Sequence, residues 1–534
     1  MNADAVVIGS GPNGLVAANL LADADWSVTV LEAGPEPGGA VRTAEVTAPG
    51  FRNDLFSAFY PLSAASEVIG GLGLDRYGLR WRRAPDVLAH PTPDGPAAVL
   101  STDLDRTAAS LDRFARGAGE RWRELFARWQ AVRDPLLQAL LAPFPPVRGS
   151  LGLARVLGAR GALEFARFGL VPARRLAEES FAGAGGGLLL AGNAAHTDLA
   201  PESAGSALFG WLLASIGQDI GWPVPEGGAQ SLTDALVARL LDHGGTLECG
   251  APVTAITVRR GRATAVTVAR GEQVDAQRAV LADVGAPALY QRLLDREHVP
   301  ARLRTAIDRF QYGDATVKVD WALRRPIPWT DPDVAGAGTV HVGSSLDELT
   351  FTSAQLATGR IPSHPFLLLG QMTTTDPTRS PPGTESVWAY THVPQRVKGD
   401  AGGDLTGRWD ERESHAFAAR IEARIEALAP GFGDLIEARH LLTPVSFEAG
   451  NSNLVGGALD GGSAALHQQL VFRPVPGLGR AETPVKGLYL ASSSAHPGGG
   501  VHGACGANAA RAALFHDRFA RWRPGGRMVG PGVG

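Results

Sequence analysis

The chain has 534 residues, of which 44% are hydrophobic, so it can form several domains of roughly 150 residues or two large interleaved ones. Its 50 basic and 54 acidic residues give a net charge of −4, which offers no electrostatic reason to expect a nucleic-acid partner. Two cysteines, Cys249 and Cys505, are too few for a disulfide-rich secreted domain, and we assign no metal ligands.

The first strand-like run, from Ala5 to Ile8, begins almost at the first methionine and leaves no room for a signal peptide. The longest apolar runs, such as that around Leu188 to Ala191, are shorter than the roughly 18 residues of a membrane-spanning helix. We therefore expect a cytoplasmic protein.

Residues 4–32 have the pattern of a strand, a glycine turn, a helix and a second strand that ends in an acid. Gly9, Gly11 and Gly14 are in the GxGxxG register of a dinucleotide-binding turn, which presents free N–H groups and a positive helix end to a pyrophosphate. Glu32 follows at the distance at which a carboxylate accepts hydrogen bonds from a ribose diol.

A second glycine loop follows this unit at once. Gly38 and Gly39 would let the loop approach the same cofactor, and Arg42 would make a charge-assisted contact with its diphosphate. The alternative for Arg42 is a solvated surface guanidinium.

The segment from Leu151 to Val171 is apolar with interspersed arginines. This composition is typical of a helix at a membrane interface, but it also fits a helix that covers a substrate cavity or packs inside a domain. Further on, the glycine-rich stretch from Gly183 to Gly187 follows no convincing strand, so we expect no built-in NAD(P)H site there.

The central region returns to alternating patterns that predict strands. A helix over Leu232 to Leu241 precedes strands at Val253–Val258 and Ala263–Val268, and a strand at Ala279–Ala282 closes this block. The region beyond, to about residue 480, contains strand-like stretches such as Thr316–Trp321 and Phe366–Leu369.

The C-terminal region predicts a buried strand over Gly487 to Leu490, a polar loop, three glycines and a helix that starts near Val501. The first turn of that helix contains small residues, including Cys505, which we interpret as a packing residue. Such a helix can press its positive end against a flat ring that carries negative charge. The alternative is a glycine-rich connection packed against the sheet.

The two ends, VVIGSGPNGLVAANLLA and GLYLASSSAHPGGGVHGACGANAARAAL, together resemble the phytoene desaturase-like flavoproteins. The resemblance is to the soluble NAD(P)/FAD-dependent oxidoreductase branch, which is related to the pyridine nucleotide-disulphide oxidoreductase domain 2 protein. It covers nearly the whole chain and implies a noncovalently bound FAD. Many relatives have Gly-Asp after the final strand, where this chain has Ser492 and Ser493.

The resemblance places Val253 near the adenine, Ser492 and Ser493 near the ribityl chain or pyrophosphate, and a glycine loop by the isoalloxazine ring. It thereby completes the set of expected cofactor-binding residues, which are Gly9, Gly11, Gly14, Glu32, Gly39, Arg42, Val253, Ser492, Ser493, Gly499, Gly500 and Val501.

The fold expected is α/β, with a discontinuous Rossmann-like FAD-binding domain and an inserted α+β substrate domain. We assign residues 1–65, 224–290 and 481–534 to the FAD-binding domain, and residues 66–223 and 291–480 to the substrate or cap domain. A substrate cavity is expected at the junction of the two.

The expected function is an FAD-dependent oxidoreductase, a dehydrogenase, desaturase or oxidase that transfers hydride from a small lipophilic substrate to flavin N5. The electron acceptor would be oxygen or a quinone. Candidate catalytic residues are His196 and His502, with Asp198 and His496 as further polar groups, although histidines in such loops are more often structural. The alternatives are an amine oxidase-like flavoprotein, a redox-neutral flavin-dependent isomerase and a non-catalytic flavin-binding scaffold.

Overall fold

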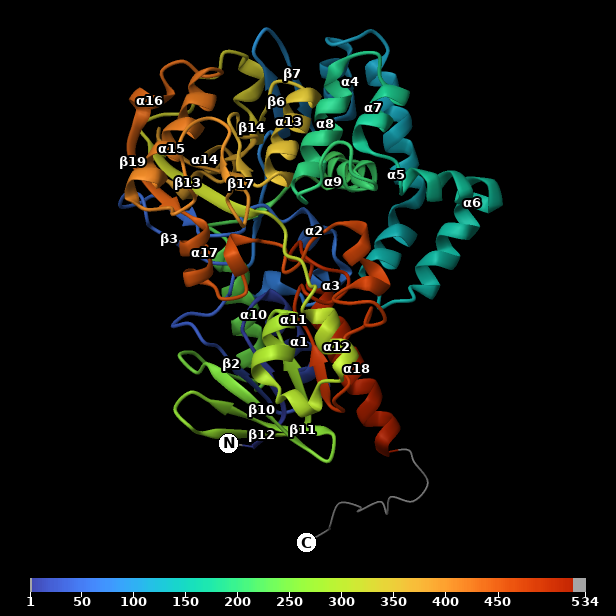
Figure 1. Ribbon diagram of the computed structural model, residues 1–534. Helices are drawn as coiled ribbons and strands as arrows, with labels where there is room; N and C mark the ends of the chain where they lie inside the picture. The colour runs from blue at the N-terminus through green and yellow to red at the C-terminus, as the bar shows by residue number, and fades with distance from the viewer. Residues whose placement is uncertain (1, 522–534) are drawn as a thin grey trace.

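The computed structural model of the chain describes residues 2–521, and within them both chain ends join one seven-stranded sheet (Figure 1). A parallel group, in the order β20, β12, β1, β2 and β9, continues from β12 into an antiparallel β11 and β10. Its strands are β1 (Asn2–Ile8), β2 (Val28–Leu31), β9 (Thr246–Glu248), β10 (Val253–Arg259), β11 (Arg262–Val268), β12 (Gln273–Ala282) and β20 (Leu488–Leu490).

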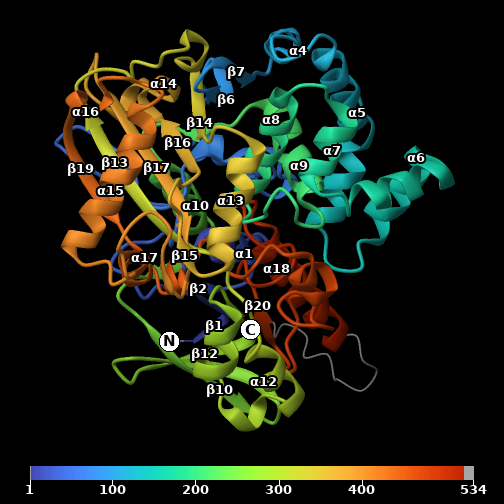
Figure 2. The same cartoon turned by 45° about the horizontal axis from the view of Figure 1, so that its top comes forward.

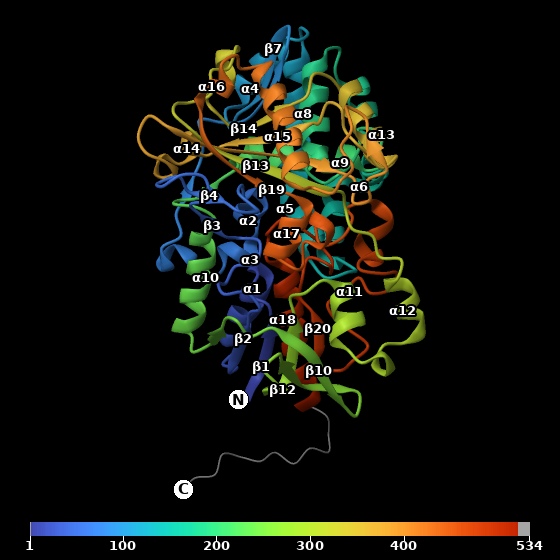
Figure 3. The same cartoon turned by 60° about the vertical axis from the view of Figure 1, so that its left-hand side comes forward.

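Helices cover this sheet and explain its apolar strands. The four residues of β2 are all buried, as expected for a parallel strand that is covered on both faces. The covering helices include α1 (Pro12–Ala22), α10 (Gln230–Asp242) and α18 (Ala504–Arg521), and α1 packs against both of the others. Figure 3 shows α1 and α18, from opposite ends of the sequence, beside the same strands.

The helix predicted to start near Val501 begins three residues later, at Ala504. Val501 and Gly503 both have positive φ angles, 53° and 71°, which are incompatible with a right-handed helix. His502 lies between them, and its Nδ1 accepts the backbone N–H of Ala504 at 3.0 Å. The expected start is therefore wrong, because residues 501–503 form a turn that ends in a side-chain cap.

A second seven-stranded sheet lies at the other end of the molecule (Figure 1). Its order is β19, β13, β17, β16, β14, β6 and β7, and its core is antiparallel. The strands are β6 (Asp86–Thr92), β7 (Gly95–Leu100), β13 (Ala315–Leu323), β14 (Ala337–Val342), β16 (Leu367–Gln371), β17 (Glu385–Val393) and β19 (Ile436–Leu442).

Helices from two stretches of sequence surround the second sheet, and α4, α8 and α9 contact its strands directly. The main ones are α4 (Leu104–Asp112), α5 (Ala118–Leu141), α7 (Ala173–Ser180), α8 (Ala184–Ala195), α9 (Ser206–Ile220), α13 (Leu346–Ala357) and α15 (Glu411–Glu426). The glycine-rich stretch from Gly183 to Gly187 belongs to the start of α8, which is buried and packs against α9.

Short two-stranded ribbons tie distant segments together. They are β3 (Thr43–Ala44) with β4 (Asn53–Asp54), β5 (Trp81–Arg82) with β8 (Val224–Pro225), and β15 (Arg360–Ile361) with β18 (Gly399–Asp400). Shorter helices complete the connections, namely α2 (Pro61–Ala65), α3 (Glu67–Gly70), α11 (Ala286–Ala288), α12 (Ala301–Ile307), α14 (Met372–Thr375), α16 (Phe432–Leu435) and α17 (Pro444–Gly450).

A helical arm projects from the body where α5 meets α6 (Val147–Phe168) (Figure 1, Figure 2). The two helices cross at Gly149, where a Cβ atom would lie 2.4 Å from the backbone nitrogen of Ala139. Among residues 2–521, no helix is long and apolar enough to cross a membrane.

Candidate active site

Four parallel strands of the first sheet end at the same edge. Gly9 follows β1, Glu32 follows β2, Asp283 follows β12 and Ser492 lies two residues after β20. The carboxyl edge of an open α/β sheet is where such folds bind nucleotides.

The three glycines of the first turn lie where side chains have no room. A Cβ on Gly14 would lie 2.2 Å from the carbonyl oxygen of Gly9, and a Cβ on Gly11 would lie 2.7 Å from Oδ2 of Asp283. Gly9 has a φ of 92°, which favours glycine. Helix α1 then begins with Pro12, so its free N–H groups face this turn.

Asp283 is a site residue that the sequence analysis missed. Its Oδ2 accepts the Gly14 N–H at 2.9 Å, and burial raises its pKa from 3.8 to about 7. The nearby Glu32 carboxylate raises the pKa further, while the Gly14 hydrogen bond lowers it. The signal in the sequence was its position directly after the strand that ends at Ala282.

Glu32 joins the two glycine loops. Its Oε2 accepts the Ser10 N–H at 2.8 Å and the Ser10 hydroxyl at 2.7 Å, and its Oε1 accepts the Gly34 N–H at 2.7 Å. The main-chain carbonyl of Glu32 accepts the Ala251 N–H at 2.8 Å, two residues before Val253 at the start of β10.

The second glycine loop contacts the first. A Cβ on Gly39 would lie 3.1 Å from the Cα of Gly11, so the two loops pass close to each other. Arg42 fixes the second loop, because its Nε donates to the Gly39 carbonyl at 3.0 Å and Nη2 donates to the Gly450 carbonyl at 2.8 Å. Its guanidinium also lies 5.2 Å from the centroid of Phe56.

The C-terminal glycine loop folds onto the same turn. A Cβ on Gly506 in α18 would lie 1.9 Å from the Asn13 carbonyl oxygen, so the two helix starts are in direct contact. Gly500 has a φ of 115°, and the Val501 carbonyl accepts a hydrogen bond from Ser63. The His502 carbonyl accepts the Ser66 hydroxyl at 2.7 Å, and burial lowers the pKa of His502 to about 4.

Ser492 is buried just after β20, and Ser493 is held by a buried arginine. The Arg473 guanidinium donates to the Ser493 carbonyl from Nε at 3.0 Å and from Nη2 at 2.6 Å. It also donates to the carbonyl of Asp460 at 2.9 Å and to those of Gly462 and Ser463. Arg473 thus fixes the segment from residue 460 to residue 463 against the loop that follows β20.

His196 lies away from these glycines, at the end of α8 in the second sheet's layer of helices. Its Nε2 is 2.8 Å from Nε2 of His341, and its ring contacts the Trp222 ring edge-on at 5.1 Å. Burial lowers the pKa of His196 to about 3, which makes it a neutral hydrogen-bond partner of His341 at ordinary pH. The structure does not bring His196 and His502 together.

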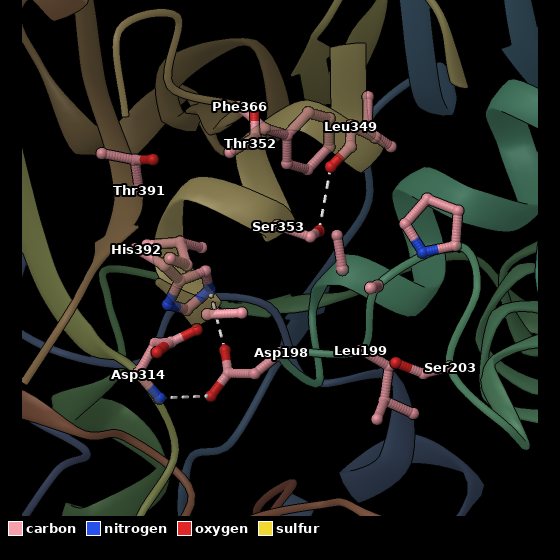
Figure 4. A pocket seen from close by; sticks show the side chains of 15 residues that line it. Asp198, Leu199, Ser203, Asp314, Leu349, Thr352, Ser353, Phe366, Thr391 and His392 are labelled. Carbon is pink, nitrogen blue, oxygen red and sulfur yellow. Dashed lines mark hydrogen bonds and ion pairs between the residues drawn. The ribbon is translucent and has the colours of Figure 1, made fainter. Parts of the chain in front are cut away.

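A cavity of about 230 Å³ lies next to α8, between α13 and β17 (Figure 4). Leu349, Leu356 and Phe366 form much of its apolar wall. Two carboxyl groups and an imidazole, from Asp198, Asp314 and His392, approach one another on its polar side (Figure 4).

The carboxyl edge of the first sheet fits an extended dinucleotide. The two glycine loops, which we call the glycine cradle, pass so close that an added Cβ would collide with the backbone, and the buried Asn13 Oδ1 beside them has no protein partner. Backbone N–H groups at a helix start suit a pyrophosphate. Within residues 2–521, no group of three or more histidine, cysteine or acidic side chains has the arrangement of a metal site.

Comparisons with known proteins identify the family and the fold of the chain. The family model described as flavin containing amine oxidoreductase matches residues 13–514. The mouse pyridine nucleotide-disulfide oxidoreductase domain-containing protein 2 is 30% identical, over 96% of this chain and 93% of its own. A neurosporene-forming phytoene desaturase of Rhodobacter capsulatus is 25% identical, over 96% and 94%. An oxidoreductase structure from Methanosarcina mazei has a TM-score of 0.60 and 16% identity, covering 96% and 100%.

Proposed function

Because the chain belongs to the flavin-containing amine oxidoreductase family and is a phytoene desaturase-like, FAD-dependent oxidoreductase, we propose that it oxidises a small lipophilic molecule. The observation that supports this proposal is the meeting of both chain ends at one glycine cradle, with an apolar cavity in the adjoining domain. Bound FAD supplies a hydride acceptor at N5.

We propose that this chain holds FAD with its two glycine loops and its C-terminal loop. Gly9, Gly11 and Gly14 would hold the AMP half with Glu32, and Val253 would approach the adenine. Gly39 and Arg42 would lie at the pyrophosphate, and Asp283, which accepts the Gly14 N–H, would hold the first glycine turn in place. The residues proposed for the flavin half are Ser492, Ser493, Gly499, Gly500 and Val501.

His196 and His502 remain proposals as catalytic residues. For His502, support comes from its place between Val501 and the start of α18, and from burial that keeps its imidazole neutral. For His196, the hydrogen bond to His341 favours a structural role unless the pair rearranges. We also propose that residues 1–65, 224–290 and 481–534 form the FAD-binding domain and that residues 66–223 and 291–480 form the substrate domain. Residues 522–534 of the last segment lie outside the described residues.

An anaerobic screen for flavin bleaching tests the proposed function. Purified holoenzyme is mixed with lipophilic alcohols, ketones, polyenes and amines, and the loss of the oxidised flavin absorbance is recorded. Bleaching by a lipophile, followed by reoxidation with oxygen or a quinone, is expected. If no compound bleaches the flavin, and if neither oxygen nor a quinone reoxidises the reduced flavin, a flavin-binding scaffold is favoured. Conversion of a compound without net bleaching would favour an isomerase.

An amine oxidase is the second candidate, because the matching family model is described by amine oxidation. The amine arm of the screen, with peroxide detection after admission of air, separates it from the first. If peroxide forms with amines alone, the substrates are amines and the first proposal is wrong.

We also propose that the α6 arm contacts an anionic membrane surface. Val147, Leu151 and Leu163 on α6 are 58%, 54% and 75% exposed, although they are apolar. This segment, which is kinked at Gly158, carries four arginines, Arg148, Arg155, Arg160 and Arg167, and one acid, Glu164. An exposed apolar and cationic helix is typical of interfacial binding.

Vesicle sedimentation tests this contact. The protein is expected to sediment with phosphatidylglycerol vesicles more than with phosphatidylcholine vesicles, and the double variant Leu151→Ser and Leu163→Ser is expected to lose most of this binding. Leu241→Ser, which changes a leucine of α10 that is 53% exposed, is the matched control. Equal binding of all three proteins would contradict the proposal. A cytoplasmic location likewise stays a proposal, which fractionation of cells that express the protein would test.

A further inference from the structure

The polar wall of the cavity is built by three segments that are distant in the sequence. Asp198 follows α8, Asp314 precedes β13 and His392 lies on β17. The Asp198 Oδ2 accepts the Asp314 N–H at 3.1 Å, and the Asp198 Oδ1 lies 3.0 Å from Nε2 of His392. Figure 4 shows these groups facing one another below the apolar wall.

The backbone is shaped to place the Asp198 carboxyl here. Asp198 has a φ of 57°, a left-handed conformation that aspartate tolerates better than most residues. A Cβ on Gly313 would lie 2.1 Å from the Asp198 Oδ2, so only glycine leaves space for the carboxyl. The side chain is therefore held at the cavity by its own turn and by the opposite segment.

His392 has unused hydrogen-bonding capacity. Both of its ring nitrogens are buried, and neither makes a hydrogen bond of normal geometry, even though Nε2 is close to Asp198. Nε2 lies 3.0 Å from the Asp198 Oδ1, and the Ala315 main chain is also near the ring, so the hydrogen bonds of this buried imidazole are incomplete. Incomplete hydrogen bonds are costly in a buried group, because its donor and its acceptor have both lost water. A ligand group that both donates and accepts would satisfy it.

The groups around the pair favour a neutral ligand. Burial and the Asp314 carboxyl raise the pKa of Asp198 well above its ordinary value, and burial lowers the pKa of His392. Burial also raises the pKa of Asp314, and raises that of Asp460 to about 7. An anionic ligand would meet several carboxyl groups at once.

The cavity size limits the apolar part of the ligand. A cavity of about 150 Å³ holds benzene, which has six heavy atoms. In proportion, this cavity of about 230 Å³ has room for about nine heavy atoms. An open groove shares Asp314, Leu356 and Ala357 with the cavity and gives a route to solvent. A long polyene would extend well beyond this volume.

Asp460 links the polar wall of the cavity to the loop proposed for the flavin. The Asp460 Oδ1 lies 3.4 Å from the place of a Cβ on Gly499, and the Asp460 carboxyl interacts electrostatically with Asp198 and His392. Arg473 anchors the Asp460 main chain to the Ser493 carbonyl. Asp460 thus lies between the polar wall of the cavity and the C-terminal glycine loop.

We propose that this cavity binds a compact lipophile of about nine heavy atoms with one neutral hydroxyl group, which hydrogen-bonds to Asp198 and His392. The inference rests on the proposed function, since it names the substrate class of that oxidoreductase. A secondary alcohol of this class would be oxidised to a ketone. Its carbinol carbon would give a hydride to the FAD named under the proposed function, and its hydroxyl proton would pass to water by way of the polar wall.

Calorimetric titration of the holoenzyme with four probes of one shape tests the inference. The probes are indane, 2-indanol, 2-aminoindane and indane-2-carboxylate. We expect 2-indanol to bind about tenfold or more tightly than indane, because it completes hydrogen bonds in a buried site, and the carboxylate to bind least. Equal affinity for indane and 2-indanol, or tighter binding of 2-aminoindane than of 2-indanol, would overturn the proposal.

Substitutions locate the site. His392→Phe keeps a ring on β17 and is expected to remove the preference for the hydroxyl, whereas His392→Asn retains a donor and an acceptor and is expected to restore most of it. Ser353→Leu fills the cavity from α13 and is expected to weaken the binding of all four probes. Phe351→Ser is the control, because Phe351 lies on the same helix and is 69% exposed.

The same samples separate this inference from the proposed function. Flavin content is read from the visible spectrum, and folding from circular dichroism, for every variant. Protein without flavin that still prefers 2-indanol would contradict the oxidoreductase but not the cavity. Fully flavinated, folded His392→Phe with an unchanged preference for 2-indanol would contradict the cavity assignment alone.

Discussion

Adding one methyl group at Gly14 should strongly affect both the stability of the protein and its FAD content. A Cβ there would lie 2.2 Å from the Gly9 carbonyl oxygen, and backbone atoms cannot move aside as a flexible side chain can. Gly14→Ala is therefore expected to destabilise the protein by about 1–3 kcal/mol and to lower its FAD content. Thermal unfolding and the flavin absorbance per chain measure both effects.

Gly70→Ala is the matched control, because a Cβ at Gly70 meets nothing within 4 Å. Its Tm and flavin content should equal those of the wild type. A Gly14→Ala protein with full flavin content and an unchanged Tm would show that the helix and strand are not as close as the structure has them.

Asp283 makes the stability of the flavin-free protein depend on pH. Its folded pKa of about 7 exceeds the ordinary 3.8, so the folded state binds the extra proton between these values. The contribution is complete below pH 4 and is lost as the pH rises through 7, by at most about 4 kcal/mol. Asp283→Asn, which can still accept the Gly14 N–H, should therefore gain stability relative to wild type from pH 4 to pH 8.

Urea unfolding of both proteins across this pH range measures the difference. Asp404→Asn, at a carboxyl whose side chain is 85% exposed, is the control and should give no such trend. A constant difference between Asp283→Asn and wild type would mean that Asp283 is ionised throughout.

Some site residues could be foreseen from the sequence and others could not. Asp283 directly follows a predicted strand, so the rule that gave Glu32 could have given it as well. Arg473 and Asp460 lie in an irregular segment whose partners are carbonyl groups of other loops. Local sequence patterns do not predict such contacts between distant loops.

At the level of elements, periodicity and glycine placement predicted most of the first sheet. β10, β11 and α10 lie within a residue or two of their predicted ranges, because alternation and helical spacing are local properties. The start of α18 differed, since positive φ angles at Val501 and Gly503 depend on contacts with Ser63 and Ser66.

The helical arm depends on a close crossing at Gly149. A Cβ there would lie 2.4 Å from the Ala139 nitrogen and 2.6 Å from its Cα, so Gly149→Ala must force α5 and α6 apart. We expect a loss of about 1–3 kcal/mol, and faster proteolysis at the arm than at other sites. Ala154→Ser, at an exposed position of α6, is the control for both measurements. Unchanged proteolysis of Gly149→Ala would contradict the crossing.

The molecule as a whole brings together segments that sequence patterns cannot pair. The resemblance of the two ends to flavoproteins implied that they share a nucleotide site, and α1 packs on α18 as that requires. The cavity is different, because Asp198, Asp314 and His392 come from three separated segments. Asp198 was a candidate for its chemistry alone, and its partners emerged only from the topology of the second sheet.

The central claim is that both ends of the chain enclose one FAD, and titration of the flavin-free protein with FAD tests it most directly. Wild type should bind one FAD per chain, released intact on denaturation. Gly506→Ala, whose Cβ would lie 1.9 Å from the Asn13 carbonyl oxygen, should bind roughly 10- to 100-fold more weakly, with exposed Arg511→Ala as the control. A wild type that takes up no FAD, or a Gly506→Ala protein that binds it as wild type does, would contradict the account.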